Sequence, residues 1–489
     1  MSLELLLDHL KQTAALSQVS GLIAWDQETM MPERGAQQRA EQAGAMAAVI
    51  HARESDPRIS EWLSEIDHNS LSEFDQCNVD QAKRSHLHAT KIPEQLASEM
   101  AKASAEGQMI WTKARDAKDF SMFAPALKKL VELKRQEAAC LAQDGMSDYD
   151  ALLDQFEPGS KTETLQPLLE SMREPLVSLR ERISEKPQPE GISGHFAKDK
   201  QLELAARVAK QLGYDFTAGR IDLSTHPFSS GSGGDSRITT RTDEADPLNC
   251  LYSTAHEVGH ALYSQGKTDL FLPAAEYCSM GVHESQSRFW ENQIARSLPF
   301  ASWLFPQMKE LFPDMNITSP DTFYAAVNKV ETGYIRTEAD EVHYNLHVLL
   351  RFELEQAMIA GELEVDDLEA EWNKRFTHYF GLEVEDIKLG VLQDVHWSVG
   401  LFGYFPTYSI GNIYSACLDA AMRKDMPGRD EKVANGETEE ILSWLRDKIH
   451  GKGRLHSAPE LIELATGETP STKPLIDYLE NKFTNLYSL

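Results

Sequence analysis

Hydrophobic residues recur every three or four positions over most of this chain of 489 residues. This spacing places them on one face of an α-helix, and the segments that show it are rich in Ala, Leu, Glu and Lys. The pattern predicts helices at residues 1–20, 35–52, 93–117, 124–142, 161–184, 339–360, 366–380, 412–424, 437–448 and 473–486. No internal repeat is present, so a solenoid is not expected. The sequence therefore predicts a mainly α-helical protein.

Three stretches interrupt the helical pattern. Residues 185–191 form a Pro-rich connector, which we interpret as a subdomain seam within a single unit spanning residues 1–489. Residues 219–243 predict a small β element. Within it, the Gly/Ser run at 229–234 is expected to be a mobile loop, and the β-branched alternation at 237–242 an edge strand or hairpin arm. Residues 400–408 combine aromatic residues with glycines, which suggests a pocket wall.

Composition narrows the class of protein. Hydrophobic residues make up 41% of the chain and charged residues 26%, as in ordinary globular proteins. A net charge of −29 argues against binding to nucleic acid or to an anionic membrane, because both would be repelled. No apolar run reaches the length of about 18 residues that spans a bilayer, and the N-terminus lacks the basic charge of a signal peptide. Five scattered cysteines without C-x-x-C spacing favour reduced thiols and a cytoplasmic location.

The strongest chemical signal is the H-E-x-x-H motif at His256-Glu-Val-Gly-His260. Its context is helical, because Asp246 suits the N-cap and Gly266 suits the C-terminal stop. Two histidines four residues apart share one helix face, so both imidazoles can bind the same Zn²⁺. Glu257 follows the first histidine directly and is placed to accept a proton from a metal-bound water. The motif therefore predicts a zinc-dependent hydrolase, with cobalt or manganese as substitutes.

A catalytic zinc needs a third protein ligand and an open position for water. The metzincin extension would put a histidine at position 266, where the chain has Gly266. Glu284, 24 residues after His260 on an expected helix, is the preferred third ligand, but spacing alone leaves Glu276 and Glu291 open.

A second histidine pair with i, i+4 spacing, His343 and His347, lacks the glutamate of the metal motif. We do not favour direct metal contact for it and expect a satisfied or substrate-facing role.

At this point the sequence resembles the carboxypeptidase Taq (thermostable carboxypeptidase 1) family of zinc metallocarboxypeptidases. Besides the metal motif, matching elements occur in order along nearly the whole chain: Trp25-Asp26 with 29–32 and Arg39-Ala-Glu-Gln42, His226-Pro-Phe228, Asp235-Ser-Arg-Ile-Thr239, His283-Glu-Ser-Gln286, Ile335-Arg-Thr-Glu-Ala-Asp340 and Gly390-Val-Leu-Gln-Asp-Val-His-Trp397. The resemblance implies that Glu284 is the third ligand. It also implies an elongated helical fold with a deep central groove, similar to neurolysin and angiotensin-converting enzyme. A homodimer and broad-specificity removal of single residues from peptide C-termini are implied as well.

Peptide hydrolysis also needs a donor for the developing oxyanion. His396, which lies in a motif shared with the family, and Tyr408, in the adjacent aromatic loop, are the expected donors. Tyr404 is a weaker alternative that can also contact substrate.

An exopeptidase must recognise a free carboxylate, for which arginine is best suited. We prefer Arg336 over Arg237, because Arg336 begins a helix expected to line the groove, whereas Arg237 can pair with Asp235. The alternative function is a zinc endopeptidase or dipeptidyl carboxypeptidase with the same metal core.

Overall fold

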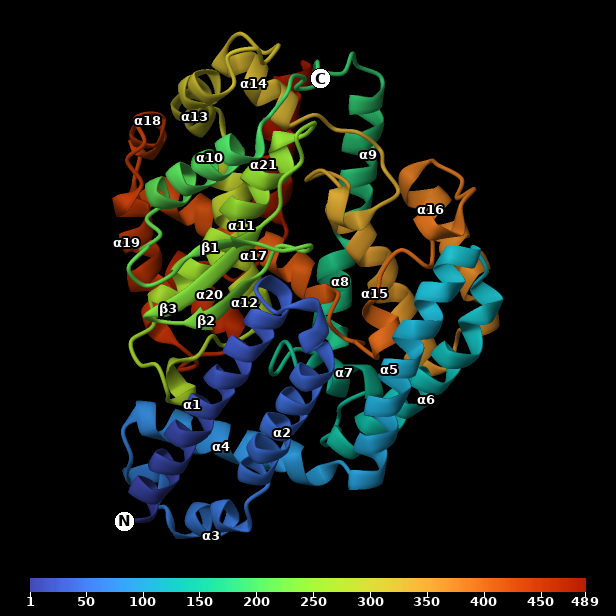
Figure 1. Cartoon of the computed structure of the whole chain (residues 1–489), viewed down its shortest axis with the longest axis vertical. Helices are drawn as coiled ribbons and strands as arrows, with labels where there is room; N and C mark the ends of the chain where they lie inside the picture. The colour runs from blue at the N-terminus through green and yellow to red at the C-terminus, as the bar shows by residue number, and fades with distance from the viewer.

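The computed structural model describes all residues, 1–489, as a predominantly helical protein with one small sheet (Figure 1). The prediction of a mainly α-helical protein with a small β element is confirmed. The helices are α1 (Ser2–Thr29), α2 (Ala36–Glu54), α3 (Pro57–Glu65), α4 (Glu73–Lys91), α5 (Glu94–Ala117), α6 (Ala124–Leu141), α7 (Asp148–Leu153), α8 (Thr162–Glu170), α9 (Arg173–Ser184), α10 (Lys198–Gln211), α11 (Pro247–Gln265), α12 (Met280–Arg288), α13 (Leu298–Leu311), α14 (Pro320–Val327), α15 (Tyr344–Ala360), α16 (Leu368–Phe380), α17 (Pro406–Asp425), α18 (Arg429–Ala434), α19 (Glu439–Lys448), α20 (Ala458–Thr466) and α21 (Lys473–Tyr487).

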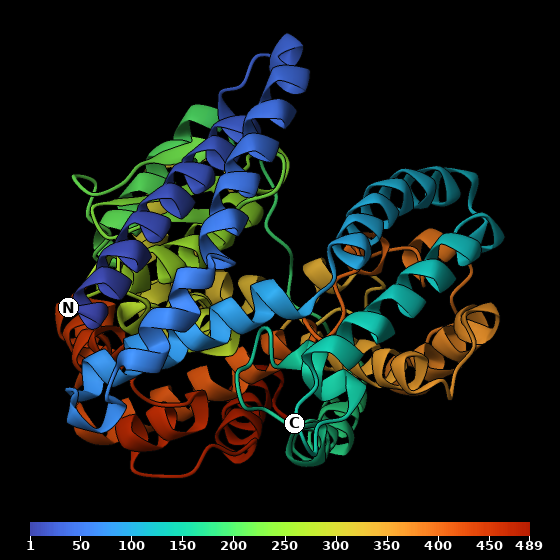
Figure 2. The same ribbon diagram turned by 90° about the horizontal axis from the view of Figure 1, so that it is seen from below.

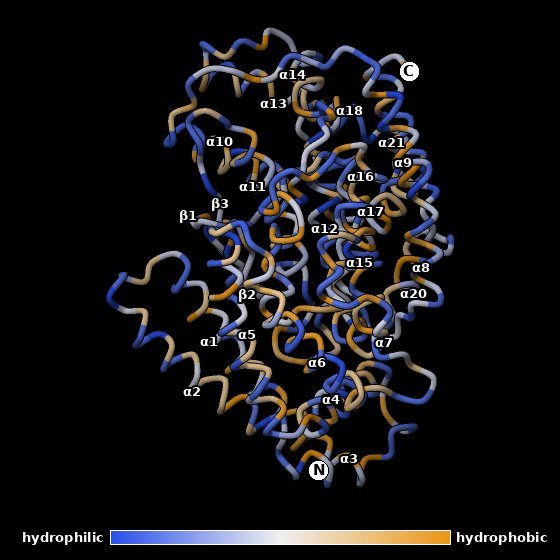
Figure 3. Tube along the Cα trace, turned by 90° about the vertical axis from the view of Figure 1, so that its right-hand side faces the viewer, coloured by the Kyte–Doolittle hydropathy of each residue, from blue (hydrophilic) through white to orange (hydrophobic).

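The elements fall on two sides of the molecule. Helices α1 and α2 and the sheet lie on one side, and α5, α6, α15 and α16 lie on the other (Figures 1 and 2). The largest hydrophobic cluster includes residues of α6, α11, α15 and α17 and so joins the two sides. A second, small cluster holds the start of α1 against α3 and α4, through Leu6, Ile59, Val79 and Ala82. Most helices contain both hydrophobic and hydrophilic residues along their length, as expected of amphipathic helices (Figure 3).

The helix predictions were wrong in several places: the helix predicted at 1–20 runs on to Thr29, the one predicted at 339–360 begins at Tyr344, and α3, α4, α10 and α14 lie outside the predicted ranges. Proline accounts for two further differences. The predicted helix at 161–184 is two helices, α8 and α9. Pro175 has no N–H to donate to the carbonyl of Ser171, so the break falls there. The predicted loop at 400–408 gives way to α17 already at Pro406, which occupies a first-turn position where its missing N–H has no cost.

The sheet consists of β1 (Ile221–Leu223), β2 (Ser229–Ser232) and β3 (Asp235–Thr240) in the order β1-β3-β2. β1 runs parallel to β3 and β2 antiparallel to it, with Ser232 opposite Asp235. The interpretation of 229–234 as a mobile loop was wrong for the part that forms β2. The Gly233-Gly234 turn, with φ of 54° at Gly233, closes a tight hairpin. The β-branched segment is a hairpin arm, as predicted, but it lies at the centre of the sheet and not at its edge.

None of the helices combines the length and the hydropathy that crossing a membrane requires. All five cysteines are free. The seam at 185–191 and the deep groove stay predictions.

Glu157 joins the connection after α7 to the start of α12. The backbone amide of Gly281 donates to its Oε1, and the amide of Met280 donates to the carbonyl of Phe156 at 3.0 Å. Glu157 is 1% exposed, and burial raises its pKa from 4.5 to about 8, although hydrogen bonds from Ser279 and Gly281 oppose this. The folded state therefore keeps a proton on Glu157 that the unfolded chain releases above about pH 4.5.

This proton makes stability depend on pH. Because the folded state binds more protons, the contribution of Glu157 to stability should fall as the pH rises from about 5 to about 8. Glu157→Gln removes the titrating group. We expect the Tm of the variant, relative to the wild type, to rise by a few degrees between pH 5.5 and pH 8 in thermal unfolding experiments. Glu163→Gln, at an exposed glutamate of α8, should leave the Tm difference constant. Parallel curves for Glu157→Gln and the wild type would contradict the assignment.

Candidate metal centre

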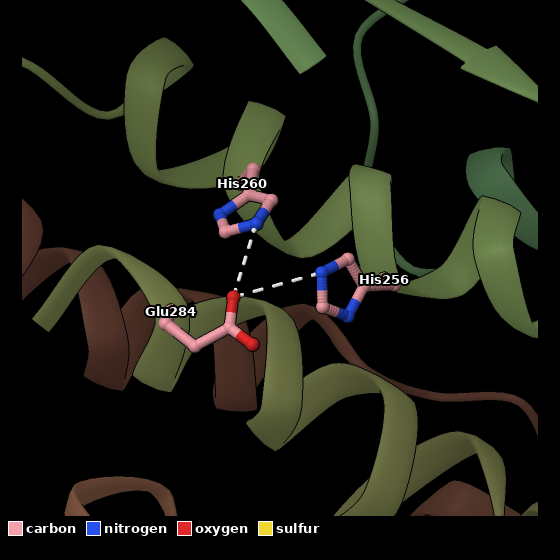
Figure 4. Close-up of side chains that lie close together, drawn as sticks. All are labelled: His256, His260 and Glu284. Atoms are coloured by element: carbon pink, nitrogen blue, oxygen red, sulfur yellow. Dashed lines mark ion pairs between the residues drawn. The ribbon is translucent and has the colours of Figure 1, made fainter. Parts of the chain in front are cut away.

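Helix α11 carries the H-E-x-x-H motif and has the predicted ends. The side chain of Asp246 accepts from the amide of Leu248 at 2.9 Å, and the helix ends at Gly266. His256 and His260 lie on one face, with ring centroids 4.9 Å apart. α12 packs against this helix and brings Glu284 to the two imidazoles (Figure 4).

The distances between these side chains fit a metal ion. Oε2 of Glu284 lies 3.6 Å from Nε2 of His256 and 3.4 Å from Nε2 of His260. Two ligand atoms bound tetrahedrally at about 2.0–2.1 Å from one metal are roughly 3.3–3.4 Å apart. The three side chains form a group whose ligand atoms all lie within 4.8 Å of one another. Two imidazoles and one carboxylate are also the donor set expected of a catalytic metal site with a free position.

Further contacts orient the two imidazoles. Nδ1 of His256 lies 2.9 Å from Oε2 of Glu291, and Nδ1 of His260 lies 3.2 Å from the carbonyl oxygen of His283. A proton on each Nδ1 satisfies these acceptors and leaves Nε2 with a lone pair for the metal. The ring of His283 also stacks on that of His260 at 4.4 Å.

The structure distinguishes Glu284 from Glu276 and Glu291, the two other candidates for the third metal ligand. Glu291 lies in the π-helical segment Phe289–Ala295 and faces Nδ1 of His256, on the far side of the ring from Nε2. Burial alone would raise the pKa of Glu291, but Arg288 and His256 lower it to about 2, so this carboxylate is ionised. Glu276 forms an ion pair with Lys267. Only Glu284 meets both Nε2 atoms.

Glu257 is 7% exposed. Burial raises the pKa of Glu257 to about 7; the charge of His260 opposes this rise, and Glu284 and Glu291 add to it. A carboxyl group with a pKa near neutrality can both accept and release a proton, as a general base requires.

His396, Tyr404 and Tyr408 form an aromatic cluster. Nε2 of His396 lies 3.3 Å from the hydroxyl of Tyr408, and the two tyrosine rings are 5.3 Å apart. Tyr408 lies on α17, which packs against the helix α12 that carries Glu284. Burial raises the pKa of both phenols, and the charge of Glu284 adds to this. Burial lowers the pKa of His396 to about 4. Near pH 7 the histidine is neutral and Tyr408 keeps a proton that it can donate.

The two candidate arginines lie in different places. Arg336 is buried, pairs with Asp394 at 3.0 Å, and lies over the ring of Tyr408 at 4.8 Å. It opens a short 3-10 helix, Arg336–Glu338, and not the helix that the sequence predicted. Arg237 pairs with Asp235 at 2.7 Å and lies 4.3 Å from the ring of Trp25 on α1. The structure therefore brings Arg336, but not Arg237, to the aromatic cluster.

Comparison with known proteins agrees with this geometry. A family model described as carboxypeptidase Taq (M32) metallopeptidase matches residues 5–483. The chain belongs to this family. It is 40% identical to thermostable carboxypeptidase 1 of Thermus thermophilus, over 99% of this chain and 98% of that protein. It is 36% identical to carboxypeptidase 1 of Bacillus subtilis, over 99% of this chain and 98% of that protein. The structure of an M32 carboxypeptidase from Deinococcus radiodurans R1 superposes with a TM-score of 0.96 at 36% identity, over 100% of both chains.

Membership of the M32 family confirms the resemblance that the sequence motifs carried. The protein is a metallocarboxypeptidase, it acts on peptides, and it uses a divalent metal ion. The His256, His260 and Glu284 group is the place in this chain where such an ion fits.

Close approach of α17 to α12 is a feature of this M32 site that spacing did not predict. A Cβ atom added at Gly411 would lie 2.5 Å from Cγ of Glu284. On α11, a Cβ at Gly259 would lie 2.5 Å from Cα of Ser287. Both contacts are closer than carbon atoms tolerate, so the two glycines allow the helices to approach closely and hold Glu284 beside His256 and His260.

Gly411→Ala should therefore weaken metal binding. The added methyl group must displace Glu284 or separate α12 from α17, which should cost about 1–3 kcal/mol of stability. We expect a loss of metal affinity of about tenfold or more, measured by titration of the metal-free protein. Gly44→Ala on α2, where a Cβ meets nothing within 4 Å, is the matched control and should be neutral or slightly stabilising. Unchanged metal affinity in Gly411→Ala would contradict this account.

Proposed function

We propose that the chain is a zinc-dependent carboxypeptidase that removes single residues from peptide C-termini with broad side-chain preference. The observation that carries this proposal is the approach of Glu284 Oε2 to two imidazole Nε2 atoms at 3.4 and 3.6 Å, beside the buried Glu257. When bound, zinc polarises the substrate carbonyl and makes its water acidic.

The protein groups supply the remaining chemistry. Glu257 takes the proton from the attacking water and delivers it to the leaving nitrogen. The phenol of Tyr408, supported by His396, donates to the carbonyl oxygen as negative charge develops there. Tyr404 lines the same region and contacts the substrate.

Arg336 is the proposed partner of the substrate carboxylate. Asp394 pairs with both Arg336, at 3.0 Å, and Arg351, at 2.6 Å. One carboxylate facing two guanidinium groups leaves one positive charge unbalanced, and this charge favours an incoming carboxylate. Gln393 also accepts from the backbone amide of Arg336 at 3.0 Å and so holds this turn in place.

Two experiments test the proposal. Metal analysis of the purified protein should find about one zinc ion per chain, and activity should disappear on chelation and return with zinc. Mass analysis of short peptide digests should show stepwise loss of single C-terminal residues. Internal cuts would support the endopeptidase alternative, and loss of dipeptides would support the dipeptidyl carboxypeptidase alternative. Either result would overturn the proposal.

We also propose a homodimer and a cytoplasmic location. Several large hydrophobic side chains of α1 and α2 are exposed, among them Leu5, Val19, Leu22 and Val49, which supports an association surface there. The five free cysteines are compatible with a reducing compartment. Light scattering of the purified protein would determine its mass in solution.

A further inference from the structure

Arg288 contacts the metal-ligand set from one helical turn beyond Glu284. Its Nε donates to Oε1 of Glu284 at 2.7 Å, and its Nη1 donates to Oε2 of Glu291 at 3.3 Å. Oε1 is thereby engaged, whereas Oε2 is the atom that faces His256 and His260. One guanidinium thus fixes Glu284 directly and His256 through Glu291.

Tyr344 links this guanidinium to Arg336. The Tyr344 side chain, at the start of α15, is 6% exposed. The guanidinium carbon of Arg288 lies 4.2 Å from the centre of its ring, in cation–π contact. The hydroxyl of the same ring accepts from Nη1 of Arg336 at 3.2 Å. The guanidinium carbon of Arg336 is 6.0 Å from the ring centre, so the two guanidinium groups are within about 10 Å of each other.

We propose that Arg288 and Tyr344 are positioning residues that fix the distance between the metal ligand Glu284 and Arg336. The inference rests on the proposed function for the role of Arg336. One extended residue spans roughly 3.5 Å, so a carboxypeptidase must keep its carboxylate partner at a set distance from the metal to remove one residue and not two. A rigid ring that contacts both guanidinium groups provides such a spacer, because it has few rotatable bonds and is buried.

The two contacts of Tyr344 can be removed separately. Tyr344→Phe deletes the hydroxyl that meets Arg336 but keeps the ring under Arg288. We expect an unchanged zinc Kd, a KM about tenfold higher for an N-blocked dipeptide with a free carboxylate, and little change in kcat. Tyr344→Leu deletes the ring as well. It should raise both that KM and the zinc Kd of the metal-free protein, the latter about tenfold.

Arg288 is tested on zinc binding alone, which does not depend on activity. Arg288→Met should raise the zinc Kd about 10–100-fold, as loss of a contact to a ligand does in other metal sites. Arg288→Lys keeps the charge but not the fork and should restore part of the affinity. Circular dichroism checks that each variant is folded. Tyr324→Phe on α14, where the hydroxyl makes no hydrogen bond within the chain, is the matched control and should match the wild type.

The outcomes separate this inference from the proposed function. Wild-type protein should cleave the C-terminal amide of the same dipeptide at least about 100-fold more slowly than the acid. Equal cleavage of amide and acid would overturn the proposed carboxylate partner and the coupling to it. If the wild type discriminates but Tyr344→Phe has a wild-type KM, or if folded Arg288→Met binds zinc as tightly as the wild type, the positioning role is wrong and the proposed function stands.

Discussion

Replacing Glu257 by glutamine should abolish peptide hydrolysis and leave metal binding intact. Glutamine has nearly the same shape, but it cannot take a proton from water. Loss of a general base typically lowers kcat by about 10²–10⁴-fold. Glu257 is not among the three side chains whose ligand atoms converge, so the metal content should equal that of the wild type. The measurement is kcat on a short peptide at matched metal occupancy.

The control is Glu276, a glutamate that forms an ion pair elsewhere. Glu276 pairs with Lys267 and lies outside the ligand group, so Glu276→Gln should keep both activity and metal. Substantial turnover by fully metal-loaded Glu257→Gln would mean that another group accepts the proton.

Removing the carboxylate of Glu284 should cause the largest loss of metal affinity of any single glutamate substitution. Glu284→Ala deletes the one oxygen that meets both Nε2 atoms, at 3.4 and 3.6 Å. Glu291→Ala deletes only a contact to Nδ1 of His256 and should weaken binding about 10–100-fold. We therefore expect Glu284→Ala to lose more than about 100-fold, and Glu276→Gln to lose nothing. Metal analysis after dialysis, followed by titration with a competing chelator, gives the order of the three.

A different order would change the ligand assignment. If Glu291→Ala lost more metal than Glu284→Ala, Glu291 would be the ligand and Glu284 the supporting group.

Short-range patterns predicted much of this protein. The H-E-x-x-H spacing, the Asp246 cap and the Gly266 stop lie within one helix, so local geometry determines how His256 and His260 face each other. The helical periodicity located about half of the helices, several of them to within a few residues, as at α2, α5 and α6. It failed where a proline ends a helix, as at Pro175. It also failed at the Gly/Ser strand β2, whose structure depends on its pairing with β3 across the hairpin turn.

Long-range contacts were beyond the sequence pattern. Sequence spacing alone left Glu276, Glu284 and Glu291 as candidates for the third metal ligand. The family resemblance, and not the spacing, favoured Glu284. Arg288 could have been noticed, since it follows Glu284 by four residues on one helix. Tyr344 and Gly411 could not, because Tyr344 meets Arg288 and Gly411 meets Glu284 across segments far apart in the sequence, and no local pattern records those contacts.

The helix α11, which carries His256 and His260, lies in the interior of the protein, and most of its residues are buried against α10, α12, β3 and the π-helical segment. A helix enclosed in this way cannot unfold locally while its neighbours stay folded. Its amide hydrogens should therefore exchange with solvent only when the whole molecule unfolds. Heat inactivation and global unfolding should then follow a single transition, and resistance to heat in this enzyme would be gained by strengthening packing anywhere around that helix.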